Sequence, residues 1–176
     1  ALARADTSYV GAANPSSLLG LMRVSRTHRD ALLQDLRQGG FHRMDALPAS
    51  VAHGVAPLLE ARPQRARAID EACLGGEPTL GALWPGIRVA TTWTCGGTSL
   101  AAKAVAAQLP VAAIVLELGY LASEVRGTVT IGRRSGSGLP TARTHFFEFI
   151  TPSDWEAGRR DFLTLDQLAK GTDYLV

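Results

Sequence analysis

Apolar residues recur at helical spacing in the first part of the chain. A short apolar stretch at Ser8–Ala12 predicts a strand, and Asn14 and Pro15 follow it. Asn14 is suited to cap the first turn of a helix, and Pro15 loses nothing at the first helical position because its missing N–H would be unpaired there. Leucines at roughly helical spacing come next, and Gly39–Gly40 offers a left-handed exit. The pattern predicts one helix over residues 16–38.

Helical spacing continues between Pro48 and Cys73, with a break at Pro63. Before the break, one stripe contains the apolar residues Val51, Val55, Leu58 and Leu59. After it, a second helix carries Ile69 and Ala72. Both segments therefore read as packing helices. A turn at Gly75–Pro78 and a short helix over 79–84 complete this region.

From Ile87 onward, the apolar residues follow the pattern of strands rather than that of helices. Ile87–Trp93 is β-branched and aromatic, which predicts a strand, and a helix is expected over about 98–108. Val111–Leu118 is an almost uninterrupted apolar run, typical of a strand covered on both faces in a parallel sheet. Together these segments predict one βαβ unit.

Two further strands are expected beyond this unit, at Gly127–Arg133 and Arg143–Thr151. The Ser/Gly segment Ser135–Gly138 separates them, so they can pair antiparallel. Alternation within the second strand places Phe147 and Phe149 on one face and Glu148 on the other. The prediction is an α/β fold, in which a mixed sheet carries flanking helices.

Composition fits one domain rather than several. The 176 residues are 46% hydrophobic and 19% charged, which is enough apolar material for a single core. We expect one partial domain over 1–176, with a helical region at about 14–84 and a βαβ and strand region at about 87–176. The net charge of +2 is too small to favour a nucleic acid as partner. No apolar run approaches the roughly 20 residues of a membrane helix, so no membrane partner is expected.

The two cysteines and four histidines carry no recognisable site. Cys73 and Cys95 lie far apart, with neither zinc-ligand spacing nor a disulfide framework, which favours a reducing cytoplasm. The histidines have no ligand-type neighbours in the sequence, so a metal site built on them is not expected. No arrangement of a serine or cysteine hydrolase can be argued from the pattern either.

A glycine-containing loop, Thr94–Ser99, connects the strand at 87–93 to the following helix. Gly96 and Gly97 would let backbone N–H groups approach a ligand closely. The loop matches neither the dinucleotide fingerprint nor the phosphate loop, since Lys103 lies well inside the helix. A plain tight turn is the alternative interpretation.

A second candidate loop, Gly119–Glu124, directly follows the apolar run at 111–118. Ligands of open α/β sheets bind at this edge. Tyr120 offers a flat ring for a purine, the Ser123 hydroxyl can bond a phosphate oxygen, and the Glu124 carboxylate suits Mg²⁺. The alternative is a turn in which Tyr120 packs on the core and Glu124 is a solvated charge. The sequence is consistent with both interpretations.

Five segments in order resemble the auxin-responsive acyl-acid amido synthetases, the plant auxin- and jasmonate-conjugating ligases and their bacterial relatives. The segments are Asn14–Ser16, Leu83–Pro85, Trp93–Gly96, Gly119–Glu124 and His145–Phe149. The resemblance covers nearly the whole chain. It implies part of the large N-terminal domain of an adenylate-forming enzyme. This sequence departs from the family pattern at Leu121 and Ala122, where Gly and Ser are frequent.

The resemblance implies an ATP-dependent ligase that activates a small carboxylic acid as an acyl-adenylate and transfers it to the amine of an amino acid. ATP and Mg²⁺ are the implied cofactors. By similarity, Gly96 and Gly97 lie beside the adenine, and Tyr120 stacks on it. Ser123 bonds a phosphate or the substrate carboxylate, and Glu124 holds Mg²⁺. Ser123 and Glu124 are thus the implied catalytic residues.

Two segments of the family pattern are not in this sequence. The Ser/Thr/Gly-rich phosphate loop is expected upstream of Ala1, and a Tyr-Arg-x-Gly-Asp segment, followed by a small C-terminal lid, is expected after Val176. The remainder of a full-length chain is therefore an expected partner, and this chain alone is expected not to turn over. The alternative is a non-catalytic or truncated relative that acts as a binding or interaction module.

Overall fold

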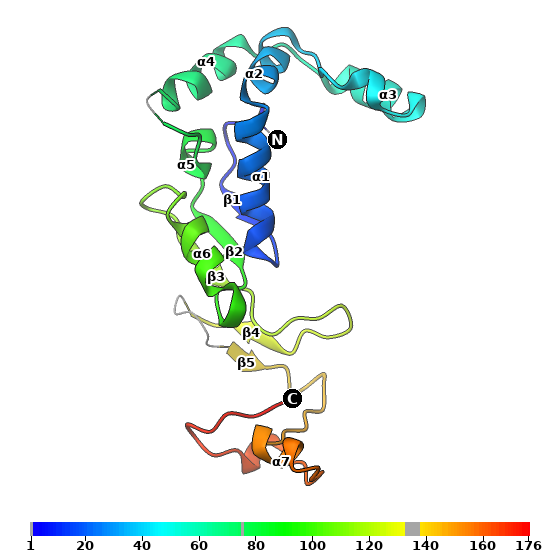
Figure 1. Ribbon diagram of the computed structural model, residues 1–176, viewed down its shortest axis with the longest axis vertical. Helices are drawn as coiled ribbons and strands as arrows, with labels where there is room; N and C mark the ends of the chain where they lie inside the picture. Colours follow the sequence, from blue (N-terminus) through cyan, green and yellow to red (C-terminus); the bar gives the residue numbers. More distant parts are fainter. Residues whose placement is uncertain (1, 75, 133–137) are drawn as a thin grey trace. The chain divides into compact units, whose positions relative to one another are not determined.

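The chain is an α/β protein in the computed structural model, which describes residues 2–74, 76–132 and 138–176 (Figure 1). This confirms the predicted fold class. The chain divides into two compact units, the first made of Ala1–Gly119 with Thr130–Ser137 and the second of Tyr120–Val129 with Gly138–Val176. The parallel sheet and all but one of the described α-helices belong to the first unit.

Three short parallel strands form the sheet of the first unit. They are β1 (Tyr9–Gly11), β2 (Val89–Thr92) and β3 (Ile114–Glu117), in the order β1-β2-β3. α6 (Ser99–Ala106) connects β2 to β3, which confirms the predicted βαβ unit. Every residue of β3 is only partly buried, so the expectation of a strand covered on both faces is wrong. The apolar run fits such a strand, but whether other elements cover its two faces is a tertiary property that the run does not encode.

The predicted helix over 16–38 is two helices, α1 (Pro15–Thr27) and α2 (Arg29–Gln38). The Asn14 side chain accepts a hydrogen bond from Ser16 N at 2.9 Å, which confirms the predicted cap. His28 lies between the helices with φ −111° and ψ 21°, outside helical geometry. Gly39 ends α2 at φ 70°, as expected for a left-handed exit. The single-helix prediction was wrong because apolar spacing continues across the break.

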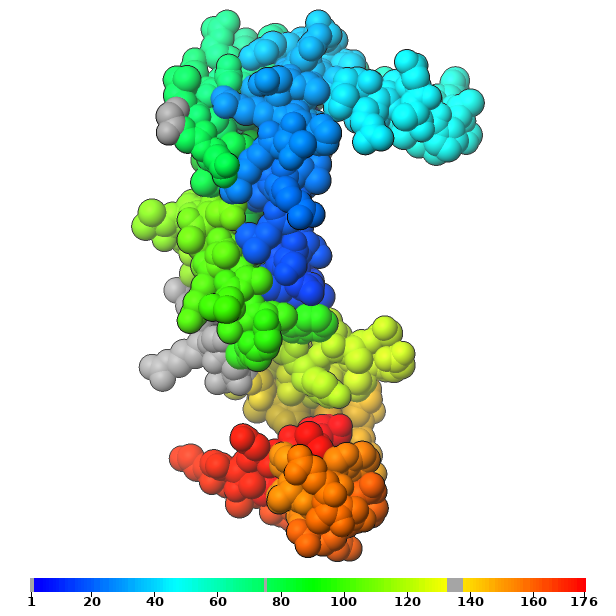
Figure 2. Space-filling model, viewed as in Figure 1, coloured from blue at the N-terminus to red at the C-terminus, as the bar shows by residue number. Residues whose placement is uncertain are grey.

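α3 (Ala49–Val55) buries none of its residues, and the cyan segment that contains it stands out from the neighbouring helices (Figure 2). Val51 is 46% exposed and Leu58 is 77% exposed, so the prediction of a packing helix is wrong here. α4 (Pro63–Ala72) does pack, through Ala66 and Ile69, while the expected Ala72 is exposed. Periodicity predicts a helix correctly, but it does not say that a neighbour covers the stripe.

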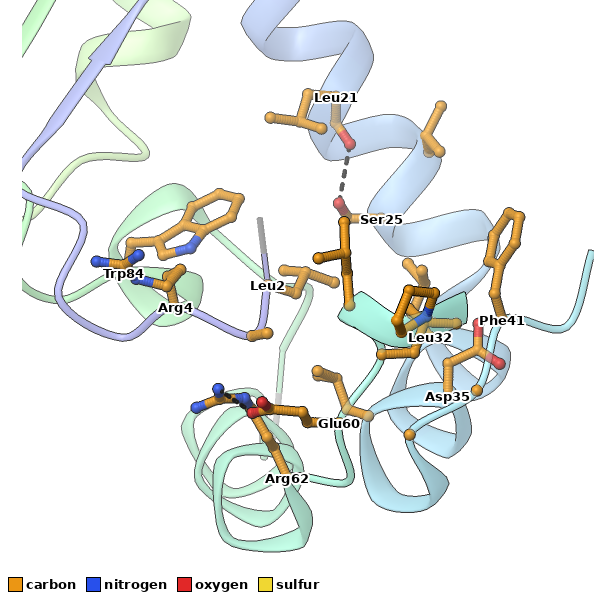
Figure 3. Close-up of a pocket in the computed structure, with 18 residues that line it drawn as sticks. Leu2, Arg4, Leu21, Ser25, Leu32, Asp35, Phe41, Glu60, Arg62 and Trp84 are labelled. Carbon is orange, nitrogen blue, oxygen red and sulfur yellow. Dashed lines mark hydrogen bonds and ion pairs between the residues drawn. The ribbon is translucent and has the colours of Figure 1, made fainter. Parts of the chain in front are cut away.

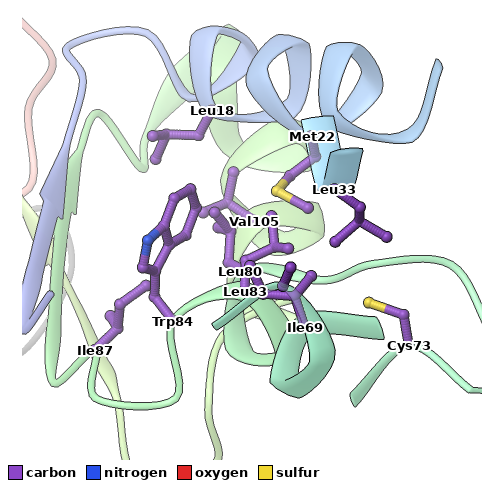
Figure 4. Packing of buried hydrophobic residues seen from close by; sticks show 11 residues of the cluster. Leu18, Met22, Leu33, Ile69, Cys73, Leu80, Leu83, Trp84, Ile87 and Val105 are labelled. Atoms are coloured by element: carbon purple, nitrogen blue, oxygen red, sulfur yellow. The ribbon is translucent and has the colours of Figure 1, made fainter. Parts of the chain in front are cut away.

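One apolar cluster joins the helices of the first unit (Figure 4). α1, α2 and α4 supply the side chains Leu18, Met22, Leu33 and Ile69, and α5 (Leu80–Leu83) supplies Leu80 and Leu83. The remaining members of the cluster are Ala66, Cys73, Trp84, Ile87 and Val105. Burying one such side chain stabilises the fold by roughly 1.5–3 kcal/mol, so this cluster is the main support of the unit. None of the helices in the described ranges is long and apolar enough to cross a membrane.

The second unit contains a short helix and, except for Thr130, a two-stranded sheet. β4 (Thr128–Thr130) pairs with β5 (Gly138–Pro140), and α7 (Pro152–Glu156) begins at Thr151, whose hydroxyl caps Asp154 N at 3.1 Å. β4 falls within the expected strand at 127–133, but Arg133 and Ser135–Ser137 lie outside the described residues.

The expected strand at Arg143–Thr151 is not formed. Only isolated bridges occur there, from Phe149 to Leu163 and from Ile150 to Leu175. The predicted alternation holds from Phe146 to Phe149, because Phe146 and Glu148 are exposed whereas Phe147 is half-buried and Phe149 is buried. It ends at Ile150, which is also buried. An aromatic, alternating segment thus became extended chain without a strand partner over most of its length.

Candidate functional site

The loops that follow β1, β2 and β3 are joined at the carboxyl edge of the parallel sheet. Trp93 N donates to Ala13 O at 2.9 Å, which links the chain after β2 to the chain after β1. The Thr92 hydroxyl, fully buried, donates to the same Ala13 O at 3.1 Å. Leu118 N donates to Thr92 O at 3.2 Å and joins the chain after β3. This is the edge where ligands of open α/β sheets bind.

The predicted glycine loop is a tight turn whose backbone is open to solvent. Gly96 has φ +59°, a conformation that residues with a side chain rarely adopt. A Cβ added at Gly96 or Gly97 would meet no heavy atom within 4 Å. The Thr98 hydroxyl donates to Cys95 O at 2.8 Å, which closes the turn immediately before α6. The loop therefore exposes main chain at the sheet edge, where a ligand can approach it.

Glu117, the last residue of β3, ties this loop to the chain after β3. Its carboxylate accepts hydrogen bonds from Thr94 N at 2.6 Å, from the Thr94 hydroxyl and from Gly119 N at 3.1 Å. Trp93 Nε1 donates to Gly119 O at 3.1 Å and adds a second link between the same segments. Sequence reasoning missed Glu117. The available signal was a carboxylate at the end of an otherwise apolar run.

The Tyr120–Glu124 segment belongs to the second unit and forms a hairpin-like turn. Leu121 and Arg126 make an antiparallel bridge, and Gly127 N donates to Tyr120 O at 2.9 Å. The Tyr120 ring lies against Gly127, since a Cβ there would fall 2.1 Å from a ring carbon. Tyr120 remains 50% exposed. One edge of the Tyr120 ring thus packs against the backbone at Gly127, while half of the side chain is exposed to solvent.

Ser123 and Glu124 are exposed near the tip of this turn. Neither side chain has a hydrogen-bond or ion-pair partner among the described residues. No group of three or more His, Cys, Asp or Glu side chains in residues 2–74, 76–132 and 138–176 could hold a metal ion. Mg²⁺ is commonly held by one or two carboxylates together with phosphate oxygens, so a single exposed carboxylate fits it. Gly96 and Gly97 lie in the first unit, while Tyr120, Ser123 and Glu124 lie in the second.

His145, from the aromatic segment, has hydroxyl neighbours rather than charged ones. Its Nδ1 lies 2.9 Å from the Thr144 hydroxyl and 3.2 Å from the Thr141 hydroxyl. The ring also contacts Phe147 edge-on, with centroids 6.3 Å apart. These contacts give His145 a structural role in the second unit.

An apolar pocket of about 590 Å³ lies among the helices of the first unit and was not predicted from the sequence (Figure 3). Three of its polar side chains are already paired, because Arg62 donates to Glu60 at 2.7 Å and the Ser25 hydroxyl donates to a backbone carbonyl at 3.0 Å. Most of the wall consists of Leu21, Val24, Leu32, Leu36, Phe41, Leu58 and Trp84. None of the site residues predicted from the sequence lines it.

Comparisons with known proteins agree with this architecture. Two solved structures match over 98% of the chain: "GH3.15 acyl acid amido synthetase", with a TM-score of 0.79 and 19% identity, and "AtGH3.15 acyl acid amido synthetase in complex with 2,4-DB", with a TM-score of 0.78 and 20% identity. At this identity the likeness shows the fold. The chain covers 31% and 30% of those two chains. No curated protein sequence matches.

The family comparison reaches over more than half of the chain. The model described as "GH3 family N-terminal domain" matches residues 1–108, which include the helices of the first unit, β1, β2 and the glycine loop. The earlier resemblance to the acyl-acid amido synthetases is thereby confirmed. The chain belongs to the GH3 family.

Proposed function

We propose that this chain forms part of an ATP-dependent ligase that activates a carboxylic acid as an acyl-adenylate and transfers it to the amine of an amino acid. The observation that carries the proposal is the solvent-open glycine turn at the carboxyl edge of a parallel sheet, in a chain of the GH3 family. Both structural neighbours are named acyl acid amido synthetases, and one is in complex with 2,4-DB. The chain spans less than a third of their length, so the reaction is proposed for a protein of which it forms part.

In this proposal the base of ATP is held by backbone and an aromatic ring. Gly96 and Gly97 lie beside the adenine, and the absence of any atom within 4 Å of an added Cβ supports room for it there. Tyr120 stacks on the base, and its half-exposed ring supports this role. Stacking of a base on an aromatic side chain is worth about 1–3 kcal/mol, which makes Tyr120 the main contributor to adenine affinity.

Ser123 and Glu124 act on the phosphates. The Ser123 hydroxyl donates to a phosphate oxygen or to the substrate carboxylate, and the Glu124 carboxylate holds Mg²⁺. Their exposure and their lack of partners among the described side chains support these roles. The metal, when bound, supplies positive charge that offsets the negative charge of the phosphates.

The chemistry has two steps. A carboxylate oxygen of the acid bonds to the α-phosphorus of ATP as the bond to the departing pyrophosphate breaks. The amine nitrogen then bonds to the acyl carbon, AMP leaves and the amine loses a proton. In both steps this chain positions the nucleotide, because an in-line displacement proceeds fast only when the reacting atoms are held in place. A cytoplasmic location belongs to the proposal, and the two free cysteines, Cys73 and Cys95, support it.

Calorimetric titration of the full-length protein that contains this chain, with AMP and with Mg²⁺·ATP, tests the proposal. We expect Tyr120→Ala to weaken binding of both nucleotides by about tenfold or more, because the stacking is lost. Glu124→Ala should weaken Mg²⁺·ATP and leave AMP nearly unchanged, since AMP does not need the metal. Phe146→Ala and Glu148→Ala are matched controls, because both residues are exposed in the same unit.

If the wild-type full-length protein binds neither nucleotide, the ligase proposal fails and an interaction module becomes the better interpretation. If it binds both and the Tyr120 variant equals its Phe146 control, the proposed role of Tyr120 is wrong.

A further inference from the structure

Glu117 is the charged residue of a strand that is otherwise Ile, Val and Leu. It is partly buried at the carboxyl end of β3. A carboxylate in such a position needs hydrogen-bond donors to offset the water it has lost. The chain supplies three, namely the Thr94 N–H, the Thr94 hydroxyl and the Gly119 N–H. Glu117 is therefore a satisfied acceptor rather than a stranded charge.

The three donors come from two different loops. Thr94 opens the glycine loop after β2, and Gly119 belongs to the chain after β3. One carboxylate thus binds the main chain of both loops, one oxygen to each, and Trp93 Nε1 repeats the connection by donating to Gly119 O at 3.1 Å. Hydrogen bonds to an ionised acceptor are about twice as strong as those between neutral groups. The arrangement fixes the start of the glycine loop relative to the end of β3.

The chemistry requires a carboxylate and not an amide. A carboxylate only accepts hydrogen bonds, and its two oxygens have about four acceptor positions. A glutamine at this position would direct its NH₂ group at the N–H of either Thr94 or Gly119, so one of those donors would lose its partner. Substitution by an isosteric amide therefore disrupts the link with almost no change in volume.

We propose that Glu117 is a positioning residue of the nucleotide site, holding the Thr94–Ser99 loop in its ligand-ready conformation through Thr94 and Gly119. This inference rests on the proposed function. Backbone donors contribute most to affinity when their position is fixed before the ligand arrives, because the cost of ordering them is then already met by folding. Glu117 acts through the loop and does not touch the nucleotide.

The test compares Glu117→Gln with Glu71→Gln. Glu71 is an exposed residue of α4 in the same unit, so its variant removes the same charge away from the loop. Amide hydrogen exchange reports whether Thr94 and Gly119 remain protected without nucleotide, and titration with AMP reports affinity. In Glu117→Gln we expect exchange at these two amides to rise by about tenfold and AMP affinity to fall by about tenfold. Both changes correspond to the loss of one charge-assisted hydrogen bond. Glu71→Gln should match the wild type in both.

Unchanged exchange at both amides in Glu117→Gln would overturn the inference, because the link would then not order the loop. Faster exchange with AMP affinity equal to the Glu71→Gln control would overturn it as well, because Glu117 would be structural only. A wild-type full-length protein that binds no AMP contradicts the proposed function itself, and a nucleotide-positioning role fails with it. If Glu117→Gln does not fold, Thr94→Val removes one of the three donors and is expected to show the same two changes at smaller size.

Discussion

Replacing Gly127 by alanine tests how the second unit holds the Tyr120 ring. A Cβ at this position would lie 2.1 Å from one ring carbon, 2.8 Å from a second and 3.2 Å from a third. Ordinary van der Waals contact begins at 3.4 Å, so the ring edge has to move by more than 1 Å. Gly127 is buried and held by backbone hydrogen bonds, whereas Tyr120 is 50% exposed. The ring is therefore expected to rotate outward while the backbone stays in place.

The stability cost follows from this geometry. Overpacking a closed site costs about 1–3 kcal/mol, and the open side of Tyr120 places this substitution near the lower end. A loss of about 1 kcal/mol corresponds to a fall in Tm of about 2–4 °C for a chain of this size. The effect on nucleotide binding is expected to be larger, because the displaced ring no longer presents its face to the base. Affinity for AMP should approach that of Tyr120→Ala, roughly tenfold below the wild type.

Thermal unfolding and AMP titration of Gly127→Ala measure both quantities. Gly132→Ala is the matched control, since a Cβ there meets no heavy atom within 4 Å. If Gly127→Ala behaves like this control in Tm and in affinity, the ring does not lie against Gly127 and the placement of Tyr120 is wrong.

Two further predictions concern the first unit. Gly39→Ala should lower the free energy of unfolding by about 2 kcal/mol or more, because Gly39 has φ +70° and an added Cβ would lie 2.5 Å from Ala61 N. Urea unfolding measures this loss. Gly40→Ala is the control, since a Cβ there meets no heavy atom within 4 Å. Burial raises the pKa of the Cys73 thiol, so at pH 8 its reactive thiolate is scarcer than in an unfolded chain. A thiol reagent should therefore modify exposed Cys95 first and Cys73 only on unfolding, and equal rates would contradict this.

Local chemistry made the ends of elements predictable. Asn14 and Pro15 identified the start of α1, because capping depends on neighbours within one turn. Gly39 identified the end of α2 by its left-handed conformation. The βαβ unit around α6 was predictable because its three segments differ in period and are separated by Gly and Pro.

Features that depend on a distant neighbour were not predictable. The stripe of α3 has the right spacing for a packing helix, yet whether another element covers it is a tertiary property. The same applies to Arg143–Thr151, whose residues favour a strand but find only isolated bridge partners at Phe149 and Ile150. His28 interrupts a continuous apolar pattern without any proline or glycine to mark the break.

The candidate site likewise has parts that local sequence predicts and parts that depend on distant neighbours. The glycine turn and the turn at Tyr120–Glu124 were predictable, because each follows a strand at the sheet edge and contains residues suited to a turn. Glu117 was not identified, since a charged residue at the end of an apolar run has the same appearance whether it points to solvent or bridges two loops. The resemblance to a family supplied the proposed roles of Ser123 and Glu124, which their exposure alone does not specify.

An NMR titration of the full-length protein with AMP, followed by ATP with Mn²⁺ in place of Mg²⁺, tests the nucleotide site residue by residue. We expect AMP to shift the amide signals of Gly96, Gly97 and Tyr120 in a saturable way. We expect Mn²⁺, whose unpaired electrons broaden nearby signals, to broaden Ser123 and Glu124 only when ATP is present. Saturable AMP shifts confined to other residues, or Mn²⁺ broadening that spares Glu124, would show that these residues do not form the nucleotide site.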